Sequence, residues 1–316
     1  MDNTSELICF EGLPTEIISC VFSQFCKHCT SHRPYTSKDE EQRIGIATLL
    51  ALSMTSKRLR PLALTILFHQ PSPGLNASYI VKMLDYEKDI GRNVKILELP
   101  IPGSSGNSNL AALKRIARRL LLDKGIYRQM RSDRESLATG LLLSLCPNVE
   151  WLAFRASDSK DREAPIKVFL NIHGKRQGFS KFTKLRILLL DTTICRTFSI
   201  AGCELALFLR QSPRLKTLIL TGTKQDRVPD NSNALDMAQC GPALESITKF
   251  YIEQWMLHDG KSRYDGNSDR RTLKNILITA RNLKSFTFST GEFGSWGDPK
   301  VRSQSTILSS VSHSVP

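Results

Sequence analysis

Residues 212–220 read Ser-Pro-Arg-Leu-Lys-Thr-Leu-Ile-Leu, and this stretch carries the sequence phrase from which the fold is predicted. A short polar turn is followed by apolar residues at Leu215, Leu218 and Leu220. In an extended strand successive side chains point to opposite faces, so the last two leucines of this L-x-x-L-x-L spacing share one face. The phrase recurs along the chain, which indicates a repeated structural unit.

The recurrences are unevenly spaced. Their first apolar positions are Val94, Val149, Leu185, Leu215, Leu244 and Leu283. The steps between them are 55, 36, 30, 29 and 39 residues. Leucine-rich repeats usually take about 20–29 residues, so this array needs at least one insertion. We expect it after Val94, in the segment that holds Ser104 to Ser108 and an arginine-rich helix.

The phrase predicts an α/β fold. No single repeat can bury its own apolar face, so neighbouring repeats must cover one another. Apolar residues at three- and four-residue spacing predict helices between the strands, over residues 136–146, 203–211, 233–239 and 270–280. We therefore expect an irregular leucine-rich-repeat solenoid with parallel strands and outer helices over residues 73–300. The alternative is an ordinary layered α/β fold with parallel strands, although the recurring turn favours the solenoid.

Strand alternation also predicts an outward lane of side chains between the inward leucines. If the array curves, this lane forms a concave surface that could bind a protein. Leu189 and Ile219 would then be exposed apolar residues, as a binding surface tolerates. The alternative is that loops cover the lane. Its candidate residues are Glu98, Arg155, Leu189, Asp191, Ile219, Thr221, Thr287 and Ser289.

Residues 1–72 follow a different, helical pattern. Pro14 suits the first helical position, and two adjacent apolar rows follow it, one with Ile17 and Val21, the other with Ile18, Phe22 and Phe25. A polar insertion spans residues 26–43. A second helix is expected from near Ile46, and Pro61 should open or kink a third.

Two segments of this region, LPTEIISCVFSQF (residues 13–25) and LLALSMTSKRLRPLALTILF (residues 49–68), together resemble the F-box motif of fungal F-box proteins with leucine-rich repeats. In that family the three-helix motif binds a Skp-type adaptor, which joins it to a cullin–RING ubiquitin ligase, and the repeats select the protein to be ubiquitinated. The insertion is longer than in the typical motif, and Leu59 stands where the family often has tryptophan.

The resemblance implies a non-enzymatic substrate adaptor of an SCF-type ligase. It places the adaptor contacts at Leu13, Pro14, Ile17, Ile18, Val21, Phe22, Leu49 and Leu50. Two alternatives remain open: a repeat scaffold with no ligase role, in which these helices only cap the array, and a basic nucleic-acid-binding protein.

The amino-acid composition limits the kinds of partner that the protein is expected to bind. Lys and Arg number 44 against 30 Asp and Glu, so the chain carries a charge of +14 and favours an acidic partner. No apolar stretch approaches the roughly 20 residues of a membrane helix, and the N-terminus lacks the apolar region of a secretory signal. The 8 cysteines are too sparse for a disulfide scaffold. We expect a cytoplasmic or nuclear protein that binds no membrane, with a Ser-rich tail over residues 301–316.

Basic residues gather in two clusters, at Lys114, Arg115, Arg118 and Arg119, and at Lys175, Arg176, Lys181, Lys184 and Arg186. They could hold nucleic acid phosphates. Proteins that bind single-stranded nucleic acid place aromatic residues among the basic ones. The first cluster has no such aromatic residues nearby. Solvated faces, or docking surfaces for an acidic protein substrate, are therefore the favoured interpretation.

The sequence offers little chemistry. Gly260-Lys261-Ser262 ends like a phosphate-binding loop, but Trp255 stands where that loop needs glycine. We expect no catalytic residues, no cofactor and no metal. The best metal candidate is the Cys26–Cys29 pair with His32 as a third ligand. A loop with two free thiols is the favoured interpretation of this segment, since no second cysteine pair follows.

Overall fold

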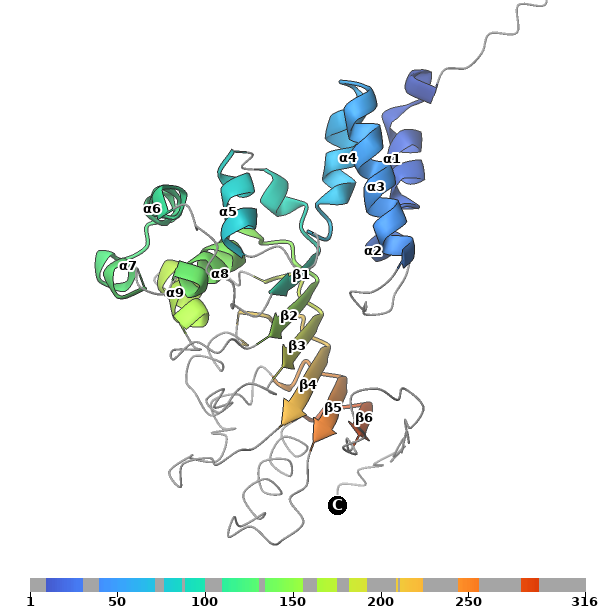
Figure 1. The fold of residues 1–316 in the computed structure, drawn as a ribbon. Helices are drawn as coiled ribbons and strands as arrows, with labels where there is room; N and C mark the ends of the chain where they lie inside the picture. The colour runs from blue at the N-terminus through green and yellow to red at the C-terminus, as the bar shows by residue number, and fades with distance from the viewer. Residues whose placement is uncertain are drawn as a thin grey trace, which may run out of the picture.

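The computed structural model of the chain describes residues 10–30, 40–71, 77–86, 89–99, 110–130, 134–155, 164–174, 182–191, 209, 211–223, 244–255 and 280–289. Figure 1 shows two regions: a group of N-terminal helices, and a twisted sheet with further helices along one side. The two regions meet where the chain leaves helix α4 and runs toward strand β1.

The N-terminal region, here called the helical module, has four helices among its described residues after the short 3-10 helix η1 (Phe10–Gly12). They are α1 (Thr15–Ser23), α2 (Lys27–Thr30), α3 (Glu40–Thr55) and α4 (Leu59–Leu67). Pro14 caps α1 instead of entering it, and its carbonyl accepts hydrogen bonds from the backbone amides of Ile17 and Ile18, both at 3.1 Å. Pro61 falls in the first turn of α4, where a missing N–H costs no intrahelical hydrogen bond.

The predicted polar insertion is helical at both ends. The first end forms α2, and the second belongs to α3, which begins at Glu40 instead of near Ile46. Two glutamates in the first turn of α3 interact favourably with the positive end of the helix. Arg43 also approaches Glu40 to 3.1 Å, one turn away. A polar stretch can therefore form the first turn of a helix; residues 31–39 lie outside the described residues.

The helical module has a small core of its own. It consists of buried residues from α1, α3 and α4 together with Cys26, namely Ile18, Phe22, Cys26, Leu49, Leu59, Ala63 and Ile66. The next residue that is buried in a core, Phe68, already belongs to the larger cluster under the sheet. The change from one core to the other therefore falls at the end of α4.

The sheet has six strands that are all parallel and neighbour one another in chain order. They are β1 (Ile96–Leu99), β2 (Trp151–Arg155), β3 (Ile187–Asp191), β4 (Thr217–Thr223), β5 (Lys249–Trp255) and β6 (Ser285–Ser289). One row of apolar residues runs across all of them in register: Leu97, Leu152, Leu188, Leu218, Phe250 and Phe286.

The turn before the strands also repeats. The backbone amide of Leu185 bonds to the carbonyl three residues earlier, and the amides of Leu215, Ile247 and Leu283 do the same, at 3.0–3.3 Å. The fifth repeat therefore begins at Ile247, and the predicted start at Leu244 is wrong. Leu244 instead occupies the position of Ser212 in the preceding turn, and Phe250 fills the place of the second leucine.

The described helices of this region lie on one side of the sheet in Figure 1: α5 (Ala77–Tyr86), α6 (Leu110–Arg119), α7 (Lys124–Met130), α8 (Arg134–Leu145) and α9 (Ala164–Gly174). Helix α8 confirms the helix predicted over residues 136–146. Of the other three predicted helices, the one over residues 233–239 lies outside the described residues. So do residues 203–208 and 210 of the helix predicted over 203–211, residues 270–279 of the helix predicted over 270–280, and the tail over residues 301–316. Leu209, the single helical residue described there, is buried.

The chain therefore has a mixed α/β fold with a parallel six-stranded sheet. A doubly wound sheet reverses its strand order at some point, whereas this sheet keeps the order of the chain throughout. That order is compatible with an α/β solenoid. Within the described part, none of the helices combines the length and the apolar character that a membrane crossing demands.

Candidate protein-binding surfaces and a thiol–imidazole cluster

Helix α1 separates its two apolar rows as the spacing predicts. Ile18 and Phe22 are completely buried in the core of the helical module. Ile17 and Val21, one position earlier in each case, are 50% and 37% exposed. A nine-residue helix with two apolar rows has thus buried one row and left the other in contact with water. Such a row is a candidate for contact with another molecule.

Helix α3 has a second exposed apolar row. Leu50 and Met54 lie four residues apart, so they share one side of the helix, and they are 44% and 80% exposed. Leu49, beside them in the sequence, is buried. We call the four residues Ile17, Val21, Leu50 and Met54 the exposed apolar set.

The structure divides the predicted adaptor contacts into two groups. Ile17, Val21 and Leu50 are exposed, and so is Pro14, whereas Leu13 is half-buried. Ile18, Phe22 and Leu49 are buried in the core. A side chain that fills the core of the module is less available to a partner than an exposed one. Met54 was not among the predicted contacts, but it is 80% exposed.

The predicted lane on the strands has the expected register. Leu189 aligns with Ile219 on the next strand, and Asp191 aligns with Thr221. Ile219, however, is buried and Leu189 is half-buried, so the middle of the lane is less exposed than predicted. Neighbouring strands lie about 4.8 Å apart, so aligned side chains shield one another.

The two ends of the lane differ. At β1, Glu98 is half-buried and accepts a hydrogen bond from Gln70 at 3.3 Å, and at β6 Thr287 is half-buried. The side chains of Arg155, Asp191, Thr221 and Ser289 lie outside the described part of the structure, although their backbone belongs to the strands.

The turns before β3 to β6 form a basic surface. Seven exposed cations lie on these turns and at the strand starts: Lys184, Arg186, Arg214, Lys216, Lys249, Arg281 and Lys284. Arg186 and Lys216 are neighbours across the sheet, since the amide of Lys216 bonds to the carbonyl of Arg186 at 2.9 Å. Glu245 is the one exposed carboxylate among the described residues of the same turns. We call this surface the basic edge. It contains two members of the second predicted basic cluster; Lys175, Arg176 and Lys181 lie outside the described residues.

The first basic cluster lies on α6 and is partly neutralised. Arg115 contacts Asp85 of α5 through two nitrogen atoms, at 2.7 and 3.1 Å. Arg119 approaches the same carboxylate to 3.8 Å. These ion pairs connect α5 and α6, which favours a structural role for half of the cluster. Lys114 and Arg118 are exposed.

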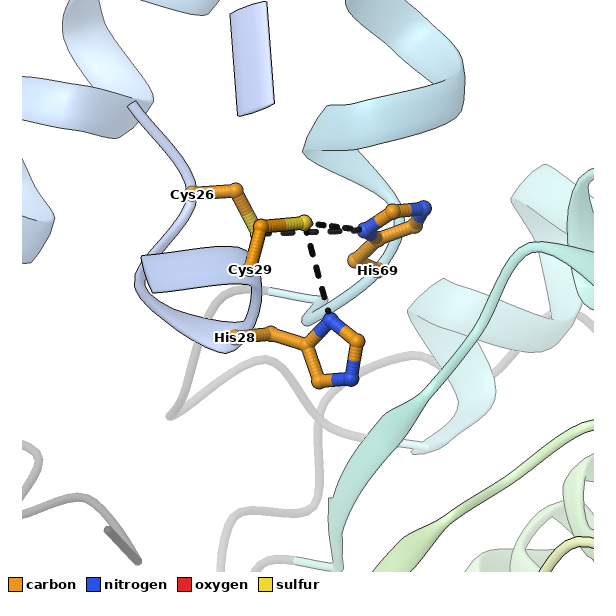
Figure 2. A group of neighbouring side chains, drawn as sticks. All are labelled: Cys26, His28, Cys29 and His69. Atoms are coloured by element: carbon orange, nitrogen blue, oxygen red, sulfur yellow. Dashed lines mark hydrogen bonds between the residues drawn. The ribbon is translucent and has the colours of Figure 1, made fainter. Parts of the chain in front are cut away.

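A cluster of thiols and imidazoles lies between the helical module and the sheet. Cys26, His28 and Cys29 belong to the segment after α1, and His69 follows α4. Figure 2 shows the four side chains converging, with Nδ1 of both histidines directed at the sulfur of Cys29. The potential ligand atoms all lie within 4.8 Å of one another. Soft sulfur and nitrogen donors in this number are those that zinc prefers.

A hydrogen bond joins the two thiols of this cluster. It lowers the pKa of Cys29, and hydrogen bonds from His28 and His69 also lower that pKa, against the effect of burial. The same sulfur–sulfur hydrogen bond, with burial, raises the pKa of Cys26. Of the two thiols, Cys29 is therefore the one that loses its proton more readily.

The sequence identified part of this cluster. Cys26 and Cys29 were recognised by their spacing, but the predicted third ligand, His32, lies outside the described residues. His69 was missed because it is 40 residues from Cys29, and no short-range pattern joins them. Comparisons with known proteins add no assignment to any of these surfaces, since no protein-family model and no curated protein matches the chain.

Proposed function

We propose that this protein is a non-enzymatic substrate adaptor of an SCF-type ubiquitin ligase. In this proposal the helical module binds a Skp-type adaptor. The six-stranded sheet with helices α5 to α9, here called the sheet region, binds the protein to be ubiquitinated. The observation that carries the proposal is the exposed apolar set on α1 and α3. It lies in the two segments that resemble the F-box motif, and the two segments pack into one module around a common core.

Apolar area that stays in contact with water is unfavourable, so burying it against a partner stabilises a complex. Ile17 and Leu50 are each close to half exposed although buried positions exist on the same helices. Removing apolar surface from water stabilises a complex by about 25 cal/mol for each Å². A small number of aliphatic anchors commonly supplies most of the binding energy of an interface. The exposed apolar set fits that role better than Ile18, Phe22 or Leu49, which hold the module together.

The basic edge supports an acidic protein as the substrate. Its cations lie on consecutive turns of the sheet, so their fields add along one side of the molecule. Surfaces of one charge steer association with partners of the opposite charge and make the rate sensitive to salt. The half-buried lane on the strands adds limited apolar area beside it.

The decisive experiment is a binding assay between the full chain and a purified Skp-type adaptor. We expect the native chain to bind, and the double variant Ile17→Asp/Leu50→Asp to lose binding by at least about 100-fold, since two apolar anchors would become charged. The matched control is Leu121→Asp, which changes a leucine that is 70% exposed in the sheet region. Circular dichroism would verify that each variant is folded.

Absence of binding by the native chain would contradict the proposal and leave the repeat scaffold without a ligase role. Equal binding by the double variant and the native chain would place the interface elsewhere. The substrate surface is tested separately by Arg186→Glu/Lys216→Glu, which should slow association with an acidic protein and leave adaptor binding unchanged.

A further inference from the structure

The geometry of the thiol–imidazole cluster matches a tetrahedral metal centre. Zn²⁺ binds sulfur at about 2.3 Å and imidazole nitrogen at about 2.0–2.1 Å, so tetrahedral angles place sulfur and nitrogen ligands about 3.6 Å apart. The sulfur of Cys29 lies 3.3 Å from Nδ1 of His69 and 3.7 Å from Nδ1 of His28. The sulfur of Cys26 lies 3.8 Å from Nδ1 of His69. All three distances fall close to the tetrahedral value.

The backbone holds two of the ligands firmly. The amide of Cys29 bonds to the carbonyl of Cys26 at 2.9 Å, which fixes the two cysteines on one helical turn. Cys26 is itself buried in the core of the helical module, and its amide bonds to the carbonyl of Ser23. A binding site is more effective when its ligands are positioned before the metal arrives, because less conformational entropy is lost.

The third ligand comes from a different part of the chain. His69 bonds through its amide to the carbonyl of Ile66 at the end of α4. Its own carbonyl accepts hydrogen bonds from the amides of Lys95 and Ile96, both at 2.8 Å, at the start of β1. His69 is therefore fixed to the helical module on one side and to the sheet on the other.

The surroundings of the cluster also suit a cation. Nε2 of His28, on the far side of the ring from the cluster, lies 4.0 Å from a carboxylate oxygen of Glu150. Carboxylates beside the second nitrogen of a metal-bound histidine commonly orient the ring and increase its basicity. Two thiolates would neutralise the charge of one divalent ion, so the ion adds no net charge to the partly buried site.

We propose that Cys26, Cys29, His69 and His28 bind one Zn²⁺ ion, which fastens the helical module to the first strand of the sheet. The donor set of two sulfurs and two nitrogens selects zinc over Mg²⁺ and Ca²⁺, which require oxygen ligands. Four protein ligands leave no open position, so the site is structural and not catalytic. The competing chemistry of the same residues is a disulfide between Cys26 and Cys29, which would exclude the metal.

The test begins with the full chain purified without chelators and analysed for metals by mass spectrometry. We expect about one zinc ion per chain, as for a closed structural site. Cys29→Ser and His69→Ala should each lose most of the zinc, and His28→Ala should bind it more weakly. The matched control is Cys20→Ser, which changes an exposed free cysteine on α1 and should retain the full amount.

Two further measurements do not depend on the variants being folded. Reconstitution of the metal-free native chain with Co²⁺ should give the absorption of a tetrahedral cobalt–thiolate centre. Removal of zinc should lower the melting temperature and increase proteolytic cleavage between α4 and β1. A chain without zinc and without a tetrahedral cobalt spectrum would overturn the proposal, as would a Cys26–Cys29 disulfide in the purified protein or full zinc retention by Cys29→Ser.

Discussion

The helical module and the sheet region bury their apolar residues in different ways. In the sheet region a row of leucines and phenylalanines runs across six aligned strands, and the apolar side chains of each strand lie beside those of the next. The helical module has a much smaller core, and it leaves five large apolar side chains of α1 and α3 exposed, namely Ile17, Val21, Ile44, Leu50 and Met54. In the sheet region the apolar residues therefore mainly stabilise the fold. In the helical module some of them remain available for binding.

This difference explains why the junction between the regions matters. The small module cannot gain much stability from its own core, since the buried fraction falls as size falls. Backbone hydrogen bonds from Lys95 and Ile96 to His69 attach it to the sheet. A metal ion bound at the thiol–imidazole cluster would strengthen the same attachment.

The largest expected effect on the free energy of unfolding comes from creating a cavity in either core. Phe22→Ala removes a ring that is completely buried in the module, and Leu188→Ala removes a completely buried leucine from the sheet. Such changes typically lower the free energy of unfolding by about 3–5 kcal/mol for Phe and about 2–5 kcal/mol for Leu. Hydrogen exchange followed by mass spectrometry should show faster exchange in α1, α3 and α4 for the first variant, and in β2 to β4 for the second.

Localised responses of this kind would support two cores that open separately. Faster exchange throughout the chain in both variants would instead mean that the regions unfold as one unit. The helical module and the sheet region would then differ in the exposure of their apolar residues but not in their stability.

A smaller effect is expected where α3 contacts the turn that follows α1. A methyl group on Gly45 of α3 would overlap the backbone carbonyl of Phe25, the residue before Cys26. Replacing glycine by alanine inside a helix normally gains about 1 kcal/mol, but overpacking costs about 1–3 kcal/mol. Gly45→Ala should therefore lower the free energy of unfolding by up to about 2 kcal/mol, as measured by urea denaturation.

Gly12→Ala is the matched control for that change, because a methyl group there would meet no atom within 4 Å. It should leave the free energy of unfolding almost unchanged. A stabilised Gly45→Ala variant would show that α3 can move away from Phe25 without loss, and the packing around Cys26 would then be looser than the structure indicates.

Sequence reasoning predicted the sheet region better than the site, for physical reasons. The L-x-x-L-x-L phrase is local, so it located the strands and five of the six repeat starts. It failed at Ile247 because Leu244, three residues earlier, is also apolar and buried. The spacing on α1 predicted two apolar rows but could not say which one faces inward. That depends on where α4 packs, and the contact is made by residues far along the chain.

The thiol–imidazole cluster shows the same limit. A helical turn explains why Cys26 and Cys29 are close, but His69 arrives from the end of another helix. Its position depends on the hydrogen bonds that its carbonyl accepts from the start of β1. Only the folded chain brings these segments together, so spacing in the sequence carries no signal for the full ligand set.

A still smaller effect on stability is expected from the exposed apolar set. Ile17→Asp and Leu50→Asp replace side chains that are 50% and 44% exposed, so each should change the free energy of unfolding by only about 0.5 kcal/mol. The same two changes combined are expected to weaken adaptor binding by at least about 100-fold. A loss comparable to that of Phe22→Ala would show that these residues belong to the core, and the contrast between the two rows of α1 would disappear.

The smallest expected effect lies on the surface of the sheet region, at Arg115. Its guanidinium contacts Asp85 at 2.7 Å, but its side chain is 59% exposed, and Arg119 also approaches that carboxylate. Solvent screening limits such pairs to about 0–1 kcal/mol, and the buried Leu113 and Ile116 on the other side of α6 supply more. Arg115→Ala should therefore lower the free energy of unfolding by less than about 1 kcal/mol, and 1 M salt should remove most of the difference.

Arg118→Ala, an exposed neighbour on the same helix, is the control and should have no effect. A larger, salt-resistant loss in Arg115→Ala alone would mean that charge, and not apolar packing, holds α5 against α6, so cohesion in the sheet region would not rest on its apolar core alone.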